Sequence, residues 1–256
     1  MKNVWLILSA FVLVAITSSC EKDPEVGAST FTLAVHPFIG DEALVLNQEY
    51  LDQENYRVKP ATLKFYVSNV VLTSASGDIK ILDLDLLDME RVAAGEPMTF
   101  QVDVPAGNYT GISFWVGLDS TQNASDPAAF DNTNPLSLSA GTFWTWNTGY
   151  RFVMLEGYYD TTQNTTGPVS TSRFFNYHTG TNLLYRKAEL GNASTAFTVA
   201  EGDNYTYNLD LDLNKVFYGP EDINRLQGAT THTTGNFPLA DKFTQNFVKA
   251  FTLSTP

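Results

Sequence analysis

The sequence has very little of the residue types on which most catalytic sites depend. Its 256 residues include a single cysteine, Cys20, and only three histidines, His36, His178 and His232. One cysteine cannot form a disulfide within the chain. A Gly-x-Ser-x-Gly nucleophile elbow and a phosphate-cradling glycine loop are also missing. These absences argue against nucleophilic catalysis, and we expect a protein that is not an enzyme.

Basic residues are scarce as well. The chain has 15 Lys and Arg against 28 Asp and Glu, which gives a formal net charge of -13. Such an acidic surface would repel phosphate backbones, so we expect no nucleic-acid partner. The sequence is instead rich in aromatic residues, with 17 Phe and 12 Tyr, and it has 17 Gly. This composition is typical of proteins made of strands and turns.

The long apolar run at the N-terminus, from Val4 to Ile16, follows the basic residue Lys2. It is too short for a comfortable membrane span and fits a cleaved signal peptide. Small residues lead from it to Cys20, which resembles the lipid-acceptor cysteine of a bacterial lipoprotein. We therefore expect a lipoprotein signal peptide over residues 1–20, a flexible tether over 21–30, and one β domain over 31–256. We expect the protein to contact the membrane only through this lipid anchor. Its expected location is the outer membrane, with the domain facing either the periplasm or the cell surface.

Strands with alternating apolar and polar residues recur through the rest of the chain. This pattern predicts an all-β fold, an antiparallel β-sandwich or barrel-like domain with long loops and minor short helices. Residues 100–104 and 109–118 flank a Pro-Ala-Gly-Asn turn, and we expect them to pair as a hairpin. Polar loops are expected at 120–140 and 158–172. Short helices are expected at 215–226 and 240–251.

The most distinctive segment runs from Gly141 to Gly157 and contains Trp144 and Trp146. On an extended segment, residues two apart point to the same face, so both indoles would lie on one side. Large apolar side chains are mostly core. A core strand is therefore the plain interpretation of this segment, and a functional one needs further support.

Acidic residues offer two weaker candidates. The pairs Asp83/Asp85 and Asp210/Asp212 fit solvated sheet edges better than a glycosidase-like carboxylate pair. Three acids in or beside the first polar loop could bind calcium through their oxygens, although ordinary loop acids are the simpler interpretation: Asp119, Asp126 and Asp131.

An ordered set of motifs carries a family resemblance. The set consists of Phe65-Tyr-Val-Ser-Asn69, Gly107-Asn-Tyr-Thr-Gly-Ile-Ser-Phe114, Phe143-Trp-Thr-Trp-Asn-Thr-Gly-Tyr-Arg-Phe152 and Tyr177-His-Thr-Gly180. In this order the motifs resemble the MbnP family, copper-binding partners associated with methanobactin systems, and especially its lipoprotein branch. The similarity covers nearly the whole chain from about Phe31 onward.

The resemblance implies a secreted or surface β-rich protein that holds copper. It also implies that a di-haem MauG-like partner enzyme oxidises one tryptophan, here Trp144 or Trp146, to kynurenine. An intact indole offers only an N–H donor, whereas kynurenine has an aryl amine that can join imidazoles around Cu(I). By the same motifs His178 would be a copper ligand. His36 is a second candidate ligand because it is the other histidine at the end of a predicted strand, and we expect His232 to be exposed.

Two hypotheses follow from the sequence. The first is a lipid-anchored, non-catalytic copper-binding protein for copper acquisition or storage. The chain has Asn123-Ala124 where the family places a histidine after the asparagine, so one ligand of that pattern is absent. The second is a structural or ligand-binding surface lipoprotein without a metal, whose partner is a carbohydrate or a protein.

Overall fold

The structure is a computed structural model, and it describes residues 29–144, 149–226 and 228–254. The predicted signal peptide, the lipidation site at Cys20 and Trp146 lie outside the described residues.

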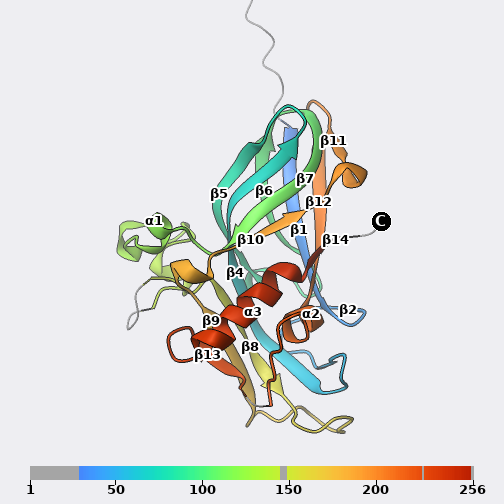
Figure 1. Ribbon diagram of the computed structural model, residues 1–256, viewed down its shortest axis with the longest axis vertical. Helices are drawn as coiled ribbons and strands as arrows, with labels where there is room; N and C mark the ends of the chain where they lie inside the picture. The colour runs from blue at the N-terminus through green and yellow to red at the C-terminus, as the bar shows by residue number, and fades with distance from the viewer. Residues whose placement is uncertain (1–28, 145–148, 227, 255–256) are drawn as a thin grey trace, which may run out of the picture.

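Two curled β-sheets form the domain, which Figure 1 shows as an elongated half-barrel. The five-stranded sheet contains β1 (Ser29–Ile39), β2 (Glu42–Ala43), β6 (Met98–Val104), β12 (Asn204–Asp212) and β14 (Phe251–Leu253). The nine-stranded sheet contains β3 (Tyr50–Leu51), β4 (Arg57–Ser74), β5 (Ile79–Asp88), β7 (Gly107–Val116), β8 (Val153–Tyr159), β9 (Phe174–Thr179), β10 (Arg186–Leu190), β11 (Phe197–Val199) and β13 (Thr230–His232). The predicted all-β class is confirmed.

The strand pairing differs from the prediction in two ways. Most neighbours are antiparallel, but β1 pairs with β12 in parallel and so does β9 with β13, so both sheets are mixed. The predicted hairpin of β6 and β7 is wrong, because β6 pairs with β1 while β7 pairs with β4, β10 and β11. Both strands bury alternate residues in the core between the sheets. The turn at Pro105 therefore carries the chain from one sheet to the other.

Two helices cover one side of the core, α2 (Leu213–Phe217) and α3 (Phe237–Lys249), so the two predicted helices are present with shifted bounds. The short helix α1 (Ser120–Asn123) lies in the loop after β7 and buries none of its residues. Helix α3 lies against β9, β10 and β13, and its Phe243 stacks on Tyr177 with ring centroids 4.7 Å apart. None of the helices in the described ranges is long and apolar enough to span a membrane.

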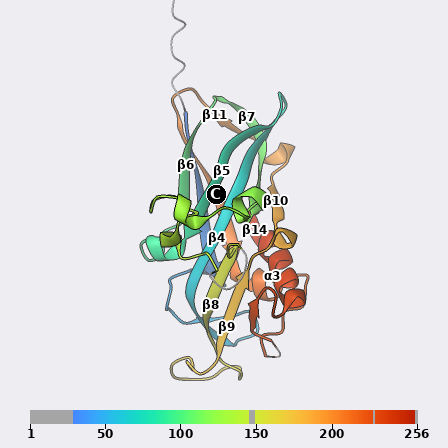
Figure 2. The same ribbon diagram turned by 90° about the vertical axis from the view of Figure 1, so that its left-hand side faces the viewer.

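The long loop between β7 and β8 folds over the outer face of the nine-stranded sheet, in front of β4 in Figure 2. Its residues build a second apolar cluster there. Tyr66 on β4 ties the loop to the sheet, because its hydroxyl donates to Pro135 O at 2.8 Å. Within the loop, the Tyr150 hydroxyl donates to Leu136 O at 2.9 Å. The loop is thereby fixed against the sheet at its buried end.

The tryptophan segment belongs to this loop and is not the strand that the sequence predicts. Strand β8 begins only at Val153, and before it the chain makes one isolated bridge between Phe143 and Tyr150. Gly149 has φ 90°, a conformation that side chains other than glycine rarely adopt. The described residues at both ends of this segment therefore do not form the continuous strand that the alternating pattern predicts.

Candidate functional site

Two histidines meet on the outer face of the nine-stranded sheet. His178 on β9 and His232 on β13 are directly opposite in the parallel register of these strands. Their Nδ1 atoms lie 3.2 Å apart, and the rings cross at 66°. The His178 side chain is buried, with 5% of the residue exposed, and His232 is half-buried. The sheet register thus joins two imidazoles that are far apart in the sequence.

Glu156 on the neighbouring strand β8 orients the His178 ring. Its Oε1 lies 2.6 Å from His178 Nε2, and the hydrogen bond to His178 lowers the pKa of Glu156. A carboxylate only accepts hydrogen bonds, so it holds the proton of a neutral His178 on Nε2. His178 Nδ1 then presents its lone pair toward His232.

His232 is itself kept in the neutral form. Burial lowers its pKa, and the positive charges of His178 and Arg151 act in the same direction. Neutral imidazole is the form that binds metal ions. The His232 ring can therefore offer a nitrogen lone pair.

Thr233 fixes the strand that carries His232. Its hydroxyl donates to His178 O at 3.1 Å and accepts from Gly180 N at 2.9 Å, and the residue is almost fully buried. Thr233 has φ 62°, which is disfavoured for a β-branched side chain. The hydrogen bonds hold the backbone in this strained conformation next to the histidine pair, as is common at functional sites.

Trp144 packs beside the segment that follows His178. Trp144 is buried, with 3% of the residue exposed. The backbone N–H of Trp144 donates to Gly149 O at 3.1 Å. A Cβ added to Gly180 would lie 3.0 Å from Trp144 Cζ3 and 2.0 Å from Tyr150 O. Only glycine leaves room for the tryptophan loop at this position. The glycine of the Tyr-His-Thr-Gly motif thus brings the predicted tryptophan next to the strand end that carries the predicted histidine.

The structure does not bring His36 to this pair. His36 lies on β1 in the five-stranded sheet, and its Nε2 is 2.9 Å from Asn208 Oδ1. His232, in contrast, was expected to be exposed, and it is half-buried opposite His178. The sequence held one weak signal for it, the β-branched residues Thr231 and Thr233 on either side, which favour a strand.

The acidic candidates act locally. Asp119 and Asp126 cap the helical turns that follow them, and Asp131 accepts from Thr133. Asp83 forms an exposed ion pair with Lys80. In the part of the chain that the structure describes, no three His, Cys, Asp or Glu side chains are grouped so that they could hold a metal ion. The histidine pair thus brings two imidazoles together, and Glu156 contacts one of them.

Comparison with known proteins agrees with the resemblance in the sequence. The structure is similar to that of MbnP from Methylosinus trichosporium, with a TM-score of 0.52 and 19% sequence identity over 81% of this chain and 84% of that chain. At this identity the likeness shows a shared fold. The comparison with curated proteins finds no match. Residues 28–234, most of the chain, match the MbnP family, and the protein therefore belongs to the MbnP family.

Proposed function

We propose that the protein binds a copper(I) ion between His178 and His232 and serves in copper acquisition or storage without catalysing a reaction. The observation that carries the proposal is the 3.2 Å separation of the two Nδ1 atoms. Two metal–nitrogen bonds of about 2.0 Å at a tetrahedral angle place their nitrogens roughly 3.3 Å apart. An ion can therefore replace the proton between the rings with little movement of either side chain.

The set of ligands favours copper(I) over zinc. A zinc ion takes four protein ligands in a structural site and at least three in a catalytic one. Only two imidazoles converge here among the described residues, and copper(I) accepts imidazole and a low coordination number. Glu156 behind His178 is the outer-shell carboxylate that metal-bound histidines commonly use. The same residues argue against a calcium site, because calcium requires six or more oxygen ligands.

A third ligand would come from the tryptophan loop. Within this proposal Trp144 or Trp146 is converted to kynurenine by a di-haem MauG-like partner, and the new aryl amine completes the copper site. The position of Trp144 against Gly180 supports this, because it places the loop beside the strand end that bears His178. Intact-mass analysis of the protein from its native host tests the conversion. The expected change is a net gain of one oxygen atom and loss of one carbon atom, because the ring takes up two oxygen atoms and hydrolysis then releases its formyl carbon as formate.

The site is expected to act outside the cytoplasm. We propose that Cys20 is lipidated after signal-peptide cleavage and anchors the domain to the outer membrane, with the domain in the periplasm or on the cell surface. The support is the order of basic, apolar and small residues before Cys20. Metabolic labelling with a fatty-acid probe in the wild type and in Cys20→Ala tests the anchor, and label on the variant would exclude it.

Titration with copper(I) against a competing chelator tests the site. His178→Ala and His232→Ala are each expected to weaken binding by more than about 100-fold, because a direct ligand contributes at least as much as an outer-shell partner. His36→Ala is the matched control, since it removes an imidazole from the other sheet and should leave the affinity unchanged. Equal losses in all three variants, or no loss in the first two, would refute the proposal.

A further inference from the structure

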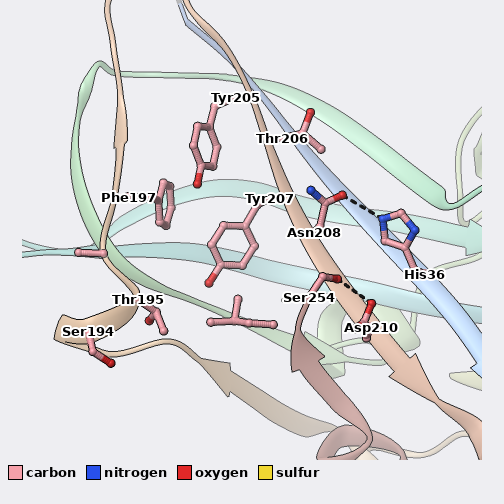
Figure 3. Close-up of a pocket in the computed structure, with 12 residues that line it drawn as sticks. His36, Ser194, Thr195, Phe197, Tyr205, Thr206, Tyr207, Asn208, Asp210 and Ser254 are labelled. Atoms are coloured by element: carbon pink, nitrogen blue, oxygen red, sulfur yellow. Dashed lines mark hydrogen bonds between the residues drawn. The ribbon is translucent and has the colours of Figure 1, made fainter. Parts of the chain in front are cut away.

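A pocket of about 780 Å³ follows strand β12, which belongs to the five-stranded sheet and not to the sheet of the histidine pair (Figure 3). Four consecutive residues of β12 line it: Tyr205, Thr206, Tyr207 and Asn208. Consecutive residues of a strand point to opposite faces of the sheet. A pocket that touches all four therefore opens on the edge of the strand, where it meets both faces at once.

This edge of β12 is free along half of its length. On one side the whole strand pairs with β1, whereas on the other β14 pairs only with residues 209–211. Ser254 N then donates to Asn208 O, so the backbone groups of Asn208 point to the β14 side. The N–H and C=O groups of successive residues in a strand point to alternate sides. The groups of Thr206, two residues before Asn208, therefore also point to the β14 side. No described strand pairs with β12 beyond that point.

The inner flank of the free edge is aromatic. Tyr205 stacks on Phe197 of β11, with ring centroids 4.8 Å apart and planes at 17°. The Tyr207 hydroxyl is buried without a hydrogen-bond partner among the described residues, and in Figure 3 it points into the space between β12 and β11. Burial raises the pKa of Tyr207 to about 12, so the hydroxyl keeps its proton. Apart from this one hydroxyl, the flank offers aromatic surface to a ligand.

The outer flank is polar and negatively charged. Asp210 accepts from the Ser254 hydroxyl at 2.6 Å, and Asn208 contacts His36. The Asp210 carboxylate still has an oxygen for a second partner. The whole chain carries a net charge of -13, which favours a cationic group on this side.

We propose that an extended segment of a partner protein binds here as an added strand, paired with the free edge of β12 at Thr206. Its inward side chains are apolar and enter the aromatic flank, and its outward side chains are basic and face Asp210. Free strand edges bind peptides in this way, with backbone hydrogen bonds for affinity and alternate side chains for specificity. A small saccharide could stack on the rings, but it would leave the N–H and C=O groups of the edge unused. This inference is independent of the copper site.

The test uses the full domain and a short synthetic peptide of alternating lysine and valine, and it measures binding by fluorescence anisotropy. Thr206→Pro removes the edge N–H without touching the bonds between β12 and β1, because those lie on the other side of the strand. It should weaken binding by at least about tenfold, while Thr206→Val, which keeps the N–H, should bind like the wild type. Equal binding by both variants, or no binding of the peptide to the wild type, would overturn the proposal.

One further measurement does not depend on the folding of Thr206→Pro. A peptide N-methylated at the alternate amides that face the edge keeps its side chains but loses the N–H groups that donate to the edge, and it should bind the wild type at least about tenfold more weakly than the parent peptide. Equal binding of the two peptides would exclude strand pairing. Sedimentation of the wild type should show a monomer. A dimer that Thr206→Pro abolishes would instead assign the edge to a second copy of this chain.

Discussion

Replacing Glu156 with glutamine removes the carboxylate that orients His178 and leaves the two imidazoles in place. Glutamine can donate its amide N–H to His178 Nε2, which moves the ring proton to Nδ1 and covers the lone pair that would bind copper. Loss of an outer-shell partner typically weakens metal binding by about 10- to 100-fold. The Glu156 side chain is 33% exposed, so water screens the pair. We therefore expect the lower end of that range, about tenfold, or about 1.4 kcal/mol.

Competition titration with a copper(I) chelator measures this effect. Glu189→Gln is the matched control, because Glu189 lies on β10 in the same sheet, is 69% exposed and pairs with Lys187. It removes the same charge from the domain and should not change the affinity for copper. If Glu156→Gln binds copper as tightly as the wild type, or if Glu189→Gln loses as much, Glu156 does not orient the ligand and the reasoning fails.

Three further predictions concern the scaffold. Phe243→Ala empties a fully buried site and should lower the free energy of unfolding by about 3–5 kcal/mol in urea denaturation; a loss below about 1 kcal/mol would contradict this packing. Gly180→Ala should displace the loop and expose Trp144 to acrylamide quenching, whereas Gly235→Ala, with no atom near the added Cβ, should not. Burial alone would raise the pKa of Asp160, but hydrogen bonds from hydroxyl, amide and guanidinium groups lower it below its ordinary value. Its stabilising effect is therefore present above about pH 4 and lost as the pH falls further, so Asp160→Asn should be less stable at pH 7 and should flatten this acid dependence.

The sequence alone determined the class of the fold and several of its elements. The alternation of apolar and polar residues predicts where the strands lie, because successive side chains of a strand point to opposite faces. The helical spacing of Phe243 and Phe247 predicts α3. The motif around His178 placed that residue on an aromatic strand, where the structure has it. These features depend on residues near one another in the chain.

Only the tertiary structure decided which residues meet. His232 is 54 residues away from His178, and the two face each other because β13 pairs with β9 in one register. The same holds for the failed hairpin of β6 and β7, where core packing sends adjacent strands to different sheets. Strand pairing is fixed by packing across the whole domain, because a local pattern shows which face of a strand is buried but not which strand lies beside it.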